Sequence, residues 1–219
     1  DNSAVAFDQT RGVTVAFGGG LPFVADAGTR EWNGTSWTLR SLPVSPPGRS
    51  LAAMAFDRLR SRVVLFGGQD ALLQKRNDTW EYDGTTWTQI ATTGGPAARS
   101  QHAMTFDPQR GVVVLYGGAT TAWSTETWEW NGSVWTQHGG GPPEVPQVLA
   151  YDEPRGRCVL LGRLPGTSGT STWERLGTTW TLVQSSTPIA SPHAGGCYDE
   201  VLGAVVANAI DFDLQVRNW

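Results

Sequence analysis

The stretch that decides the fold reads SQHAMTFDPQRGVVVLYGGATTAWSTETWEWNGSVWTQH and covers residues 100–138. Four segments in it are rich in β-branched and aromatic residues, which is typical of strands: 101–106, 112–116, 126–130 and 134–137. A short Asp-Pro-Gln-Arg-Gly turn separates the first two, and a double glycine opens a longer loop before the third. Asn131-Gly132, between the last two, favours a tight hairpin turn with two positive φ angles. The stretch therefore predicts one antiparallel four-stranded sheet.

The same pattern recurs along the chain at intervals of 45–50 residues. Nine of the eleven tryptophans fall on equivalent aromatic positions, so we interpret them as core residues that pack neighbouring sheets together. A single four-stranded sheet cannot bury both faces alone, so stacked copies are required. An aromatic residue followed by aspartate marks each unit: Phe7-Asp8, Phe56-Asp57, Phe106-Asp107, Tyr151-Asp152 and Tyr198-Asp199.

The repeat predicts an all-β propeller that forms a single domain over residues 1–219. We expect about five four-stranded blades, with the last blade incomplete because no clear fourth strand precedes Trp219. The expected blade boundaries are approximately 1–45, 46–94, 95–141, 142–187 and 188–219.

Several motifs resemble those of the kelch-repeat family, whose propellers include the galactose-oxidase-like domain. They are the double glycines, the later aromatic pair, and a Pro-x-x-Arg-Ser lead-in at 96–100 and, less regularly, at 46–50. The fourth unit departs from the pattern at Leu161-Gly162-Arg163, and the fifth departs further. The resemblance implies partner binding at the rim of long loops and at the mouth of the central channel. The copper enzymes of this group need several His and Tyr ligands, which the three histidines and four tyrosines do not supply.

Composition narrows the classes of function. The net charge is −4 and there is no basic stripe, which argues against a nucleic-acid partner. No apolar run approaches 18 residues, so we expect no membrane span. No metal-ligand spacing or catalytic motif is present, so we predict no catalytic residue, metal or cofactor. A chain that starts at Asp1 is expected to be a secreted or extracytoplasmic protein after removal of a signal peptide.

Antiparallel topology places the loops between strands two and three, and the linkers between blades, on one rim. We call this the long-loop rim, and binding residues usually lie on such variable loops. The loops are roughly 20–28, 69–78, 119–126 and 163–171, and the linkers are near 42–50, 91–101, 138–147 and 184–193.

The candidate binding residues lie on that rim. Arg49 and Arg99 open strand one of two blades, and we expect them either to bind a carboxylate or to pair with a neighbouring blade. Trp123 lies outside the repeat pattern. We expect it either to anchor a partner or a sugar ring or to fold back onto its own blade. The remaining candidates are Asp70, Lys75 and Arg76 in one polar loop, which is alternatively only solvated, and Glu144 and His193 near the channel mouth.

Cys158 and Cys197 are the two cysteines. They fall on strand two of the fourth blade and strand one of the fifth. They form either a disulfide between these blades or two buried thiols.

Three hypotheses for the function follow. The first is a non-catalytic module that binds a protein or peptide partner. The second is a carbohydrate-binding or carbohydrate-active propeller with Trp123 as a stacking residue. The third is a structural repeat protein that oligomerises through unpaired edges.

Overall fold

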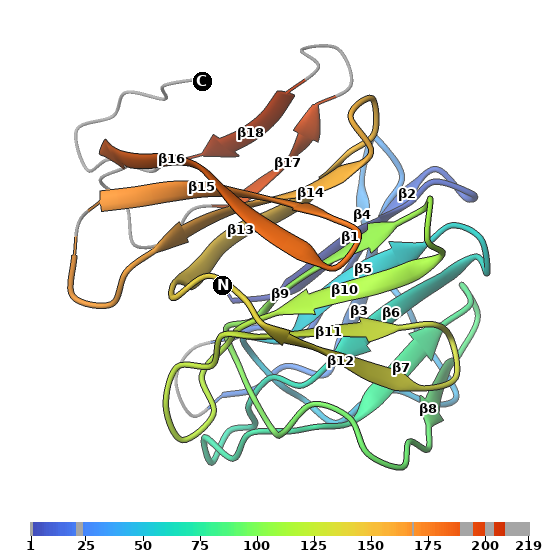
Figure 1. Ribbon diagram of the computed structural model, residues 1–219. Helices are drawn as coiled ribbons and strands as arrows, with labels where there is room; N and C mark the ends of the chain where they lie inside the picture. Colours follow the sequence, from blue (N-terminus) through green and yellow to red (C-terminus); the bar gives the residue numbers. More distant parts are fainter. Residues whose placement is uncertain (1, 21–23, 168, 189–194, 200–203, 209–219) are drawn as a thin grey trace.

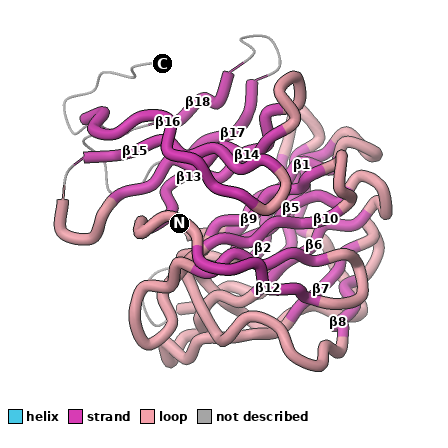
Figure 2. Tube along the Cα trace, in the orientation of Figure 1, coloured by secondary structure: helices cyan, strands magenta, loops and turns pink. Residues whose placement is uncertain are grey.

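The computed structural model describes residues 2–20, 24–167, 169–188, 195–199 and 204–208, with the backbone alone described from residue 185 onward. The described chain consists of strands and loops (Figures 1 and 2). It contains no helix long and apolar enough to cross a membrane. The strands are β1 (Ala4–Asp8), β2 (Val13–Phe17), β3 (Thr29–Trp32), β4 (Trp37–Leu39), β5 (Ala53–Asp57), β6 (Arg62–Phe66), β7 (Thr79–Tyr82), β8 (Trp87–Ile90), β9 (Ala103–Asp107), β10 (Val112–Tyr116), β11 (Glu126–Trp130), β12 (Trp135–Gly140), β13 (Val145–Asp152), β14 (Arg157–Arg163), β15 (Gly169–Leu176), β16 (Thr179–Pro188), β17 (Gly195–Asp199) and β18 (Ala204–Asn208).

These strands form four antiparallel four-stranded sheets in a propeller arrangement, which confirms the predicted fold class. Blade 1 is β1–β4, blade 2 is β5–β8, blade 3 is β9–β12 and blade 4 is β13–β16, each with its strands in chain order. Among the described residues four blades have all four strands, and no fifth four-stranded blade is formed. The fifth unit contributes the two-stranded sheet β17–β18, and residues 209–219 lie outside the described part of the chain.

The first strands of successive blades lie side by side, β1 against β5, β5 against β9 and β9 against β13. The blades follow one another in chain order, from blue to orange in Figure 1. The hairpin β17–β18 continues the series by packing against β13. Among the described strands, neither β17 nor β18 makes a comparably extended contact with β1. Within the described part of the chain, blade 1 therefore has a neighbouring blade on one face only.

Three apolar clusters fill the spaces between consecutive blades. In each, the aromatic residue that ends the second strand of one blade meets the aromatic-Asp residue of the next. Phe66 of blade 2 thus shares a cluster with Phe106 of blade 3, and Tyr116 of blade 3 shares one with Tyr151 of blade 4. Burial of these side chains is the main stabilising contribution to the fold.

A hydrogen bond repeated at the three junctions between complete blades fixes how these blades are aligned. The indole nitrogen of the tryptophan at the start of the fourth strand, its first or second residue, donates to a threonine hydroxyl on the third strand of the preceding blade. The pairs are Trp87 to Thr29, Trp135 to Thr79 and Trp180 to Thr127, each at 2.9 Å. Because each donor and acceptor satisfies the other where water is excluded, the contact specifies one alignment as well as adding burial.

The Asp-x-x-Arg turns are held together by their own side chains. Asp8 Oδ1 accepts the backbone N–H of Arg11 at 3.0 Å, and the Arg11 side chain continues to Glu31 on β3 at 2.5 Å. On the same short-turn side of the propeller, Arg58 of blade 2 forms an exposed ion pair with Glu153 of blade 4 at 2.8 Å. Such exposed pairs contribute little to stability.

The prediction for the Asn-Gly hairpin was wrong in its turn type. Trp130 pairs directly with Trp135, so four residues form the loop, and only Gly132 among them has a positive φ. The Asn131 side chain explains the difference, because its Oδ1 accepts the backbone N–H groups of residues 133 and 134, each at 2.9 Å. This side-chain interaction stabilises a longer turn that needs only one glycine conformation.

The face of blade 1 that points away from blade 2 is open. Phe7 is 54% exposed and Trp37 is 51% exposed, whereas Phe56 and Trp87 at the equivalent positions of blade 2 are 8% and 1% exposed. The expectation that lattice tryptophans are core residues is therefore confirmed for Trp87 but wrong for Trp37. The sequence pattern is the same in both blades. The exposed fractions differ because Phe56 and Trp87 pack against blade 1, whereas no described blade covers Phe7 and Trp37.

This asymmetry predicts different costs for the same truncation. Phe56→Ala should reduce the free energy of unfolding by about 3–5 kcal/mol, because it leaves a cavity between two blades. Phe7→Ala should cost less than about 1 kcal/mol, because its ring is already half in water. Chemical denaturation followed by tryptophan fluorescence measures both values. Equal costs would contradict the open face.

Candidate functional site

The long-loop rim is formed where the loop between strands two and three meets the lead-in of the next blade, and backbone hydrogen bonds join the two in blades 1 and 2. Gly19 N–H donates to the carbonyl of Arg49 at 2.9 Å, and Gly68 N–H donates to the carbonyl of Arg99 at 2.9 Å. Gly68 has a φ of 93°, and a Cβ there would lie 2.8 Å from the Ser50 carbonyl oxygen. Glycine is therefore required where loop and linker approach most closely.

Arg49 is a buried side chain within this rim. It is 1% exposed and donates to both carboxylate oxygens of Asp78, at 2.6 and 2.8 Å, and to the Gly67 carbonyl at 2.9 Å. Burial acts to raise the pKa of Asp78, but the hydrogen bonds and charge of Arg49 outweigh it, so the pKa is lowered. The Trp80 indole donates to the same carboxylate at 2.7 Å.

Arg99 repeats this arrangement one blade later. It is 0% exposed, pairs with Glu126 at 2.5 Å and donates to the Gly117 carbonyl at 2.9 Å, while the Trp128 indole donates to Glu126 at 3.1 Å. Each arginine thus binds a carboxylate of its own blade, rather than one of a neighbouring blade. These two groups connect the lead-in segment to strand three.

Blade 4 carries different chemistry at the same two positions. Arg49, Arg99 and Glu144 each lie seven residues before the aromatic-Asp residue of their blade. The position of Asp78 and Glu126, two residues before the indole, is Ser171 in blade 4. An arginine–carboxylate pair is therefore replaced by a glutamate and a serine.

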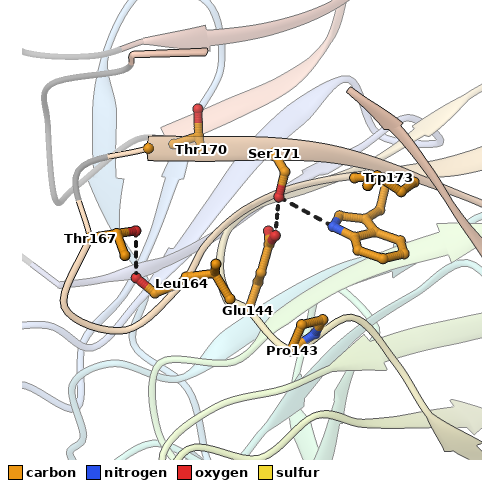
Figure 3. A pocket seen from close by; sticks show the side chains of 9 residues that line it. Pro143, Glu144, Leu164, Thr167, Thr170, Ser171 and Trp173 are labelled. Carbon is orange, nitrogen blue, oxygen red and sulfur yellow. Dashed lines mark hydrogen bonds between the residues drawn. The ribbon is translucent and has the colours of Figure 1, made fainter. Parts of the chain in front are cut away.

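Glu144 and Ser171 form one side of a pocket of about 390 Å³ (Figure 3). Ser171 Oγ donates to Glu144 Oε1 and accepts a hydrogen bond from the Trp173 indole at 3.3 Å. Glu144 is 6% exposed, and its Oε2 has no hydrogen-bond partner among the described residues. A Cβ on Gly162 would lie 2.3 Å from this oxygen, so glycine leaves the space that the carboxyl group occupies. The other lining residues are Pro143, Leu164, Thr167, Gly169, Thr170 and Leu182.

A buried carboxyl oxygen without a partner is costly, and such groups occur where a ligand or catalytic function uses them. Glu144 was singled out from the sequence, but Ser171 and Trp173 were missed as members of its site. The signal that identifies Ser171 is the alignment of blade 4 with blades 2 and 3. In blade 4 the arginine of the pair is replaced by Glu144, and the carboxylate of the pair is replaced by Ser171.

The other predicted rim residues do not gather around this pocket. Asp70 accepts two backbone N–H groups of its own loop, from Leu72 and Gln74, and pairs with Arg76 at 2.7 Å. The hydrogen bond from Gln74, above all, lowers the pKa of Asp70. The Lys75 ammonium donates to the Thr120 carbonyl in the next blade's loop. The Asp70 contacts organise their own loop, and the Lys75 contact joins this loop to that of the next blade.

Trp123 lies in the long loop of blade 3, where it is 45% exposed and forms an isolated bridge with Ala119. His193 lies outside the described residues. Cys158 is a buried thiol in the cluster between blades 3 and 4, and burial raises its pKa to about 12. In the structure Cys158 is therefore a free thiol, as in the second of the two alternatives, and the side chain of Cys197 lies outside the described residues.

No group of three or more His, Cys, Asp or Glu side chains within the described ranges is placed to hold a metal ion. Comparison of the sequence with protein-family models gave no match, and comparison with curated proteins gave none either.

His102 is a buried structural residue on the same rim. Its ring lies 5.6 Å from the Phe66 ring in an edge-on arrangement. Burial, with a smaller effect from Arg99, lowers the pKa of His102 from 6.5 to about 3. The folded state therefore keeps this imidazole neutral at pH values where the unfolded chain protonates it.

This difference predicts a specific pH dependence of stability. The contribution of neutral His102 is complete above pH 6.5 and is lost as the pH falls toward 3, by about 1.4 kcal/mol per pH unit. Between pH 7.5 and 5.0, the wild type should lose about 2 kcal/mol more than His102→Gln. Urea denaturation at the two pH values measures this, and identical losses in both proteins would refute it.

Proposed function

We propose that this chain is a kelch-type propeller that acts as a non-catalytic binding module for a protein or peptide partner. The partner contacts the long-loop rim and places one group in the pocket at Glu144. The observation that carries the proposal is the buried carboxyl group of Glu144, a residue that lines an open pocket and whose Oε2 has no partner among the described residues.

The surroundings of the pocket support recognition of a side chain. Its walls combine the Trp173 ring and the aliphatic groups of Leu164 and Leu182 with the carboxyl and hydroxyl groups of Glu144 and Ser171. Mostly apolar walls with a few polar groups are typical of binding pockets. The Tyr116 hydroxyl donates to the backbone carbonyl of Glu144 at 3.1 Å, so the segment that carries the carboxyl group is held by blade 3.

Selection from a displayed peptide library on the immobilised protein tests this function. We expect enriched peptides whose affinity falls at least about tenfold for Leu164→Trp, which places a bulky ring in the pocket. Leu59→Trp is the matched control, since Leu59 is also exposed but lies in a turn between β5 and β6. Failure to enrich any peptide would contradict the peptide-binding function, and equal binding to both variants would exclude the pocket as the place where the peptide binds.

Glycan recognition is a second candidate, and the exposed ring of Trp123 on the long-loop rim favours it. A glycan array probed with the wild type and with Trp123→Ala separates the two functions. Binding that is lost in this variant supports a carbohydrate ligand, and an array without binding leaves the peptide function as the better account.

Oligomerisation is a third candidate, favoured by the open face of blade 1 with Phe7 and Trp37. Light scattering over a range of protein concentrations tests it. A constant monomer mass would exclude this function.

A further inference from the structure

Blades 2 and 3 each hold a guanidinium group at the long-loop rim. In both, the group contacts a carboxylate and a glycine carbonyl. The charges of arginine and carboxylate compensate each other, so the buried site is neutral. Two blades therefore hold an arginine–carboxylate pair at this place in the repeat.

Blade 4 keeps the position but not the guanidinium group. Glu144 takes the place of the arginine, Ser171 takes the place of the carboxylate, and Trp173 keeps the place of the indole. No ion pair within the described residues involves Glu144, and its Oε2 accepts no hydrogen bond from them. A buried carboxylate without a cation is destabilising, and a bound cation compensates its charge.

We propose that the Glu144 pocket binds the guanidinium group of an arginine side chain supplied by a peptide or protein partner. This inference rests on the proposed binding function and names the group that the pocket recognises. The geometry is the reverse of that in blades 2 and 3: the carboxylate comes from the lead-in segment and the guanidinium from outside the chain.

The lining of the pocket suits arginine as a whole side chain. A guanidinium group donates two parallel hydrogen bonds to a carboxylate and stacks on an aromatic face, here Glu144 and Trp173. Leu164, Leu182 and Pro143 surround the same space and contact the aliphatic stem of the side chain. Lysine matches the charge but presents a single ammonium group without the planar fork.

Titration calorimetry with short capped peptides tests the proposal. The probes are three tripeptides with glycine on both sides of arginine, citrulline or lysine. Citrulline has nearly the shape of arginine but no charge, so we expect its peptide to bind at least about tenfold more weakly. The lysine peptide is expected to lie between them. Equal affinity for arginine and citrulline would overturn the proposal.

Variants locate the binding to the pocket. Glu144→Gln keeps the size of the side chain and should weaken the arginine peptide at least about tenfold. Glu153→Gln, which removes an exposed carboxyl group on the short-turn side, should leave the affinity unchanged. Unchanged affinity in Glu144→Gln would overturn the proposal.

A double variant tests whether arginine binds in the pocket, because it fills the pocket with an arginine of the chain itself. The double change Glu144→Arg with Ser171→Asp rebuilds the pair present in blades 2 and 3. We expect this protein to fold with at least wild-type stability in denaturation and to lose arginine binding. A stably folded double variant that still binds the arginine peptide would contradict the proposal.

The two proposals fail in different ways. If the peptide library yields ligands that need the pocket but contain no arginine, the guanidinium inference fails and the binding function stands. If free arginine amide binds through Glu144 but no peptide is enriched, the site is real and the partner is a small molecule. If neither arginine amide nor the arginine peptide binds at millimolar concentration, the guanidinium inference is wrong.

Discussion

The packing of one sheet against the next is the interaction on which this structure depends. A four-stranded sheet has two apolar faces, and each blade buries them only against its neighbours. The indole-to-threonine hydrogen bonds at all three junctions between complete blades fix the alignment of this packing. Everything else in the fold, including which loops meet at one rim, follows from that alignment.

Most of the fold could be predicted because tryptophans and other large aromatic residues recur at equivalent positions of the repeat. Aromatic and glycine positions identify the strands of blade 3 almost residue by residue. The predicted turn type at Asn131 was wrong because the Asn-Gly dipeptide alone does not show that the Asn131 side chain accepts two backbone N–H groups. The exposure of Trp37 could not be predicted either, because a repeat pattern describes one blade and does not show whether another blade packs against it.

The site was only partly predictable for a related reason. From the sequence, Arg49 and Arg99 were rim candidates that bind a carboxylate or pair with a neighbouring blade. They do contact carboxylates, but these belong to Asp78 and Glu126 of the same blade. Their partners lie 27–29 residues away in the chain and are found only when strand three is placed beside the lead-in. Glu144 was noted without a motif, while Ser171 lacked any local signal.

Departures from the repeat are therefore more informative about function than the repeat itself. Positions that recur in each blade, such as the turn aspartates, are explained by the turns and junctions that they stabilise. At Glu144 the chain departs from a solution that it uses twice, and it replaces a compensated ion pair by a carboxyl oxygen with no partner within the described residues. A purely structural requirement would favour the arginine pair, which fills the space and balances its charge. The three interblade clusters supply enough burial for one position to carry such a cost, and this is why a rigid propeller tolerates an incomplete site on its rim.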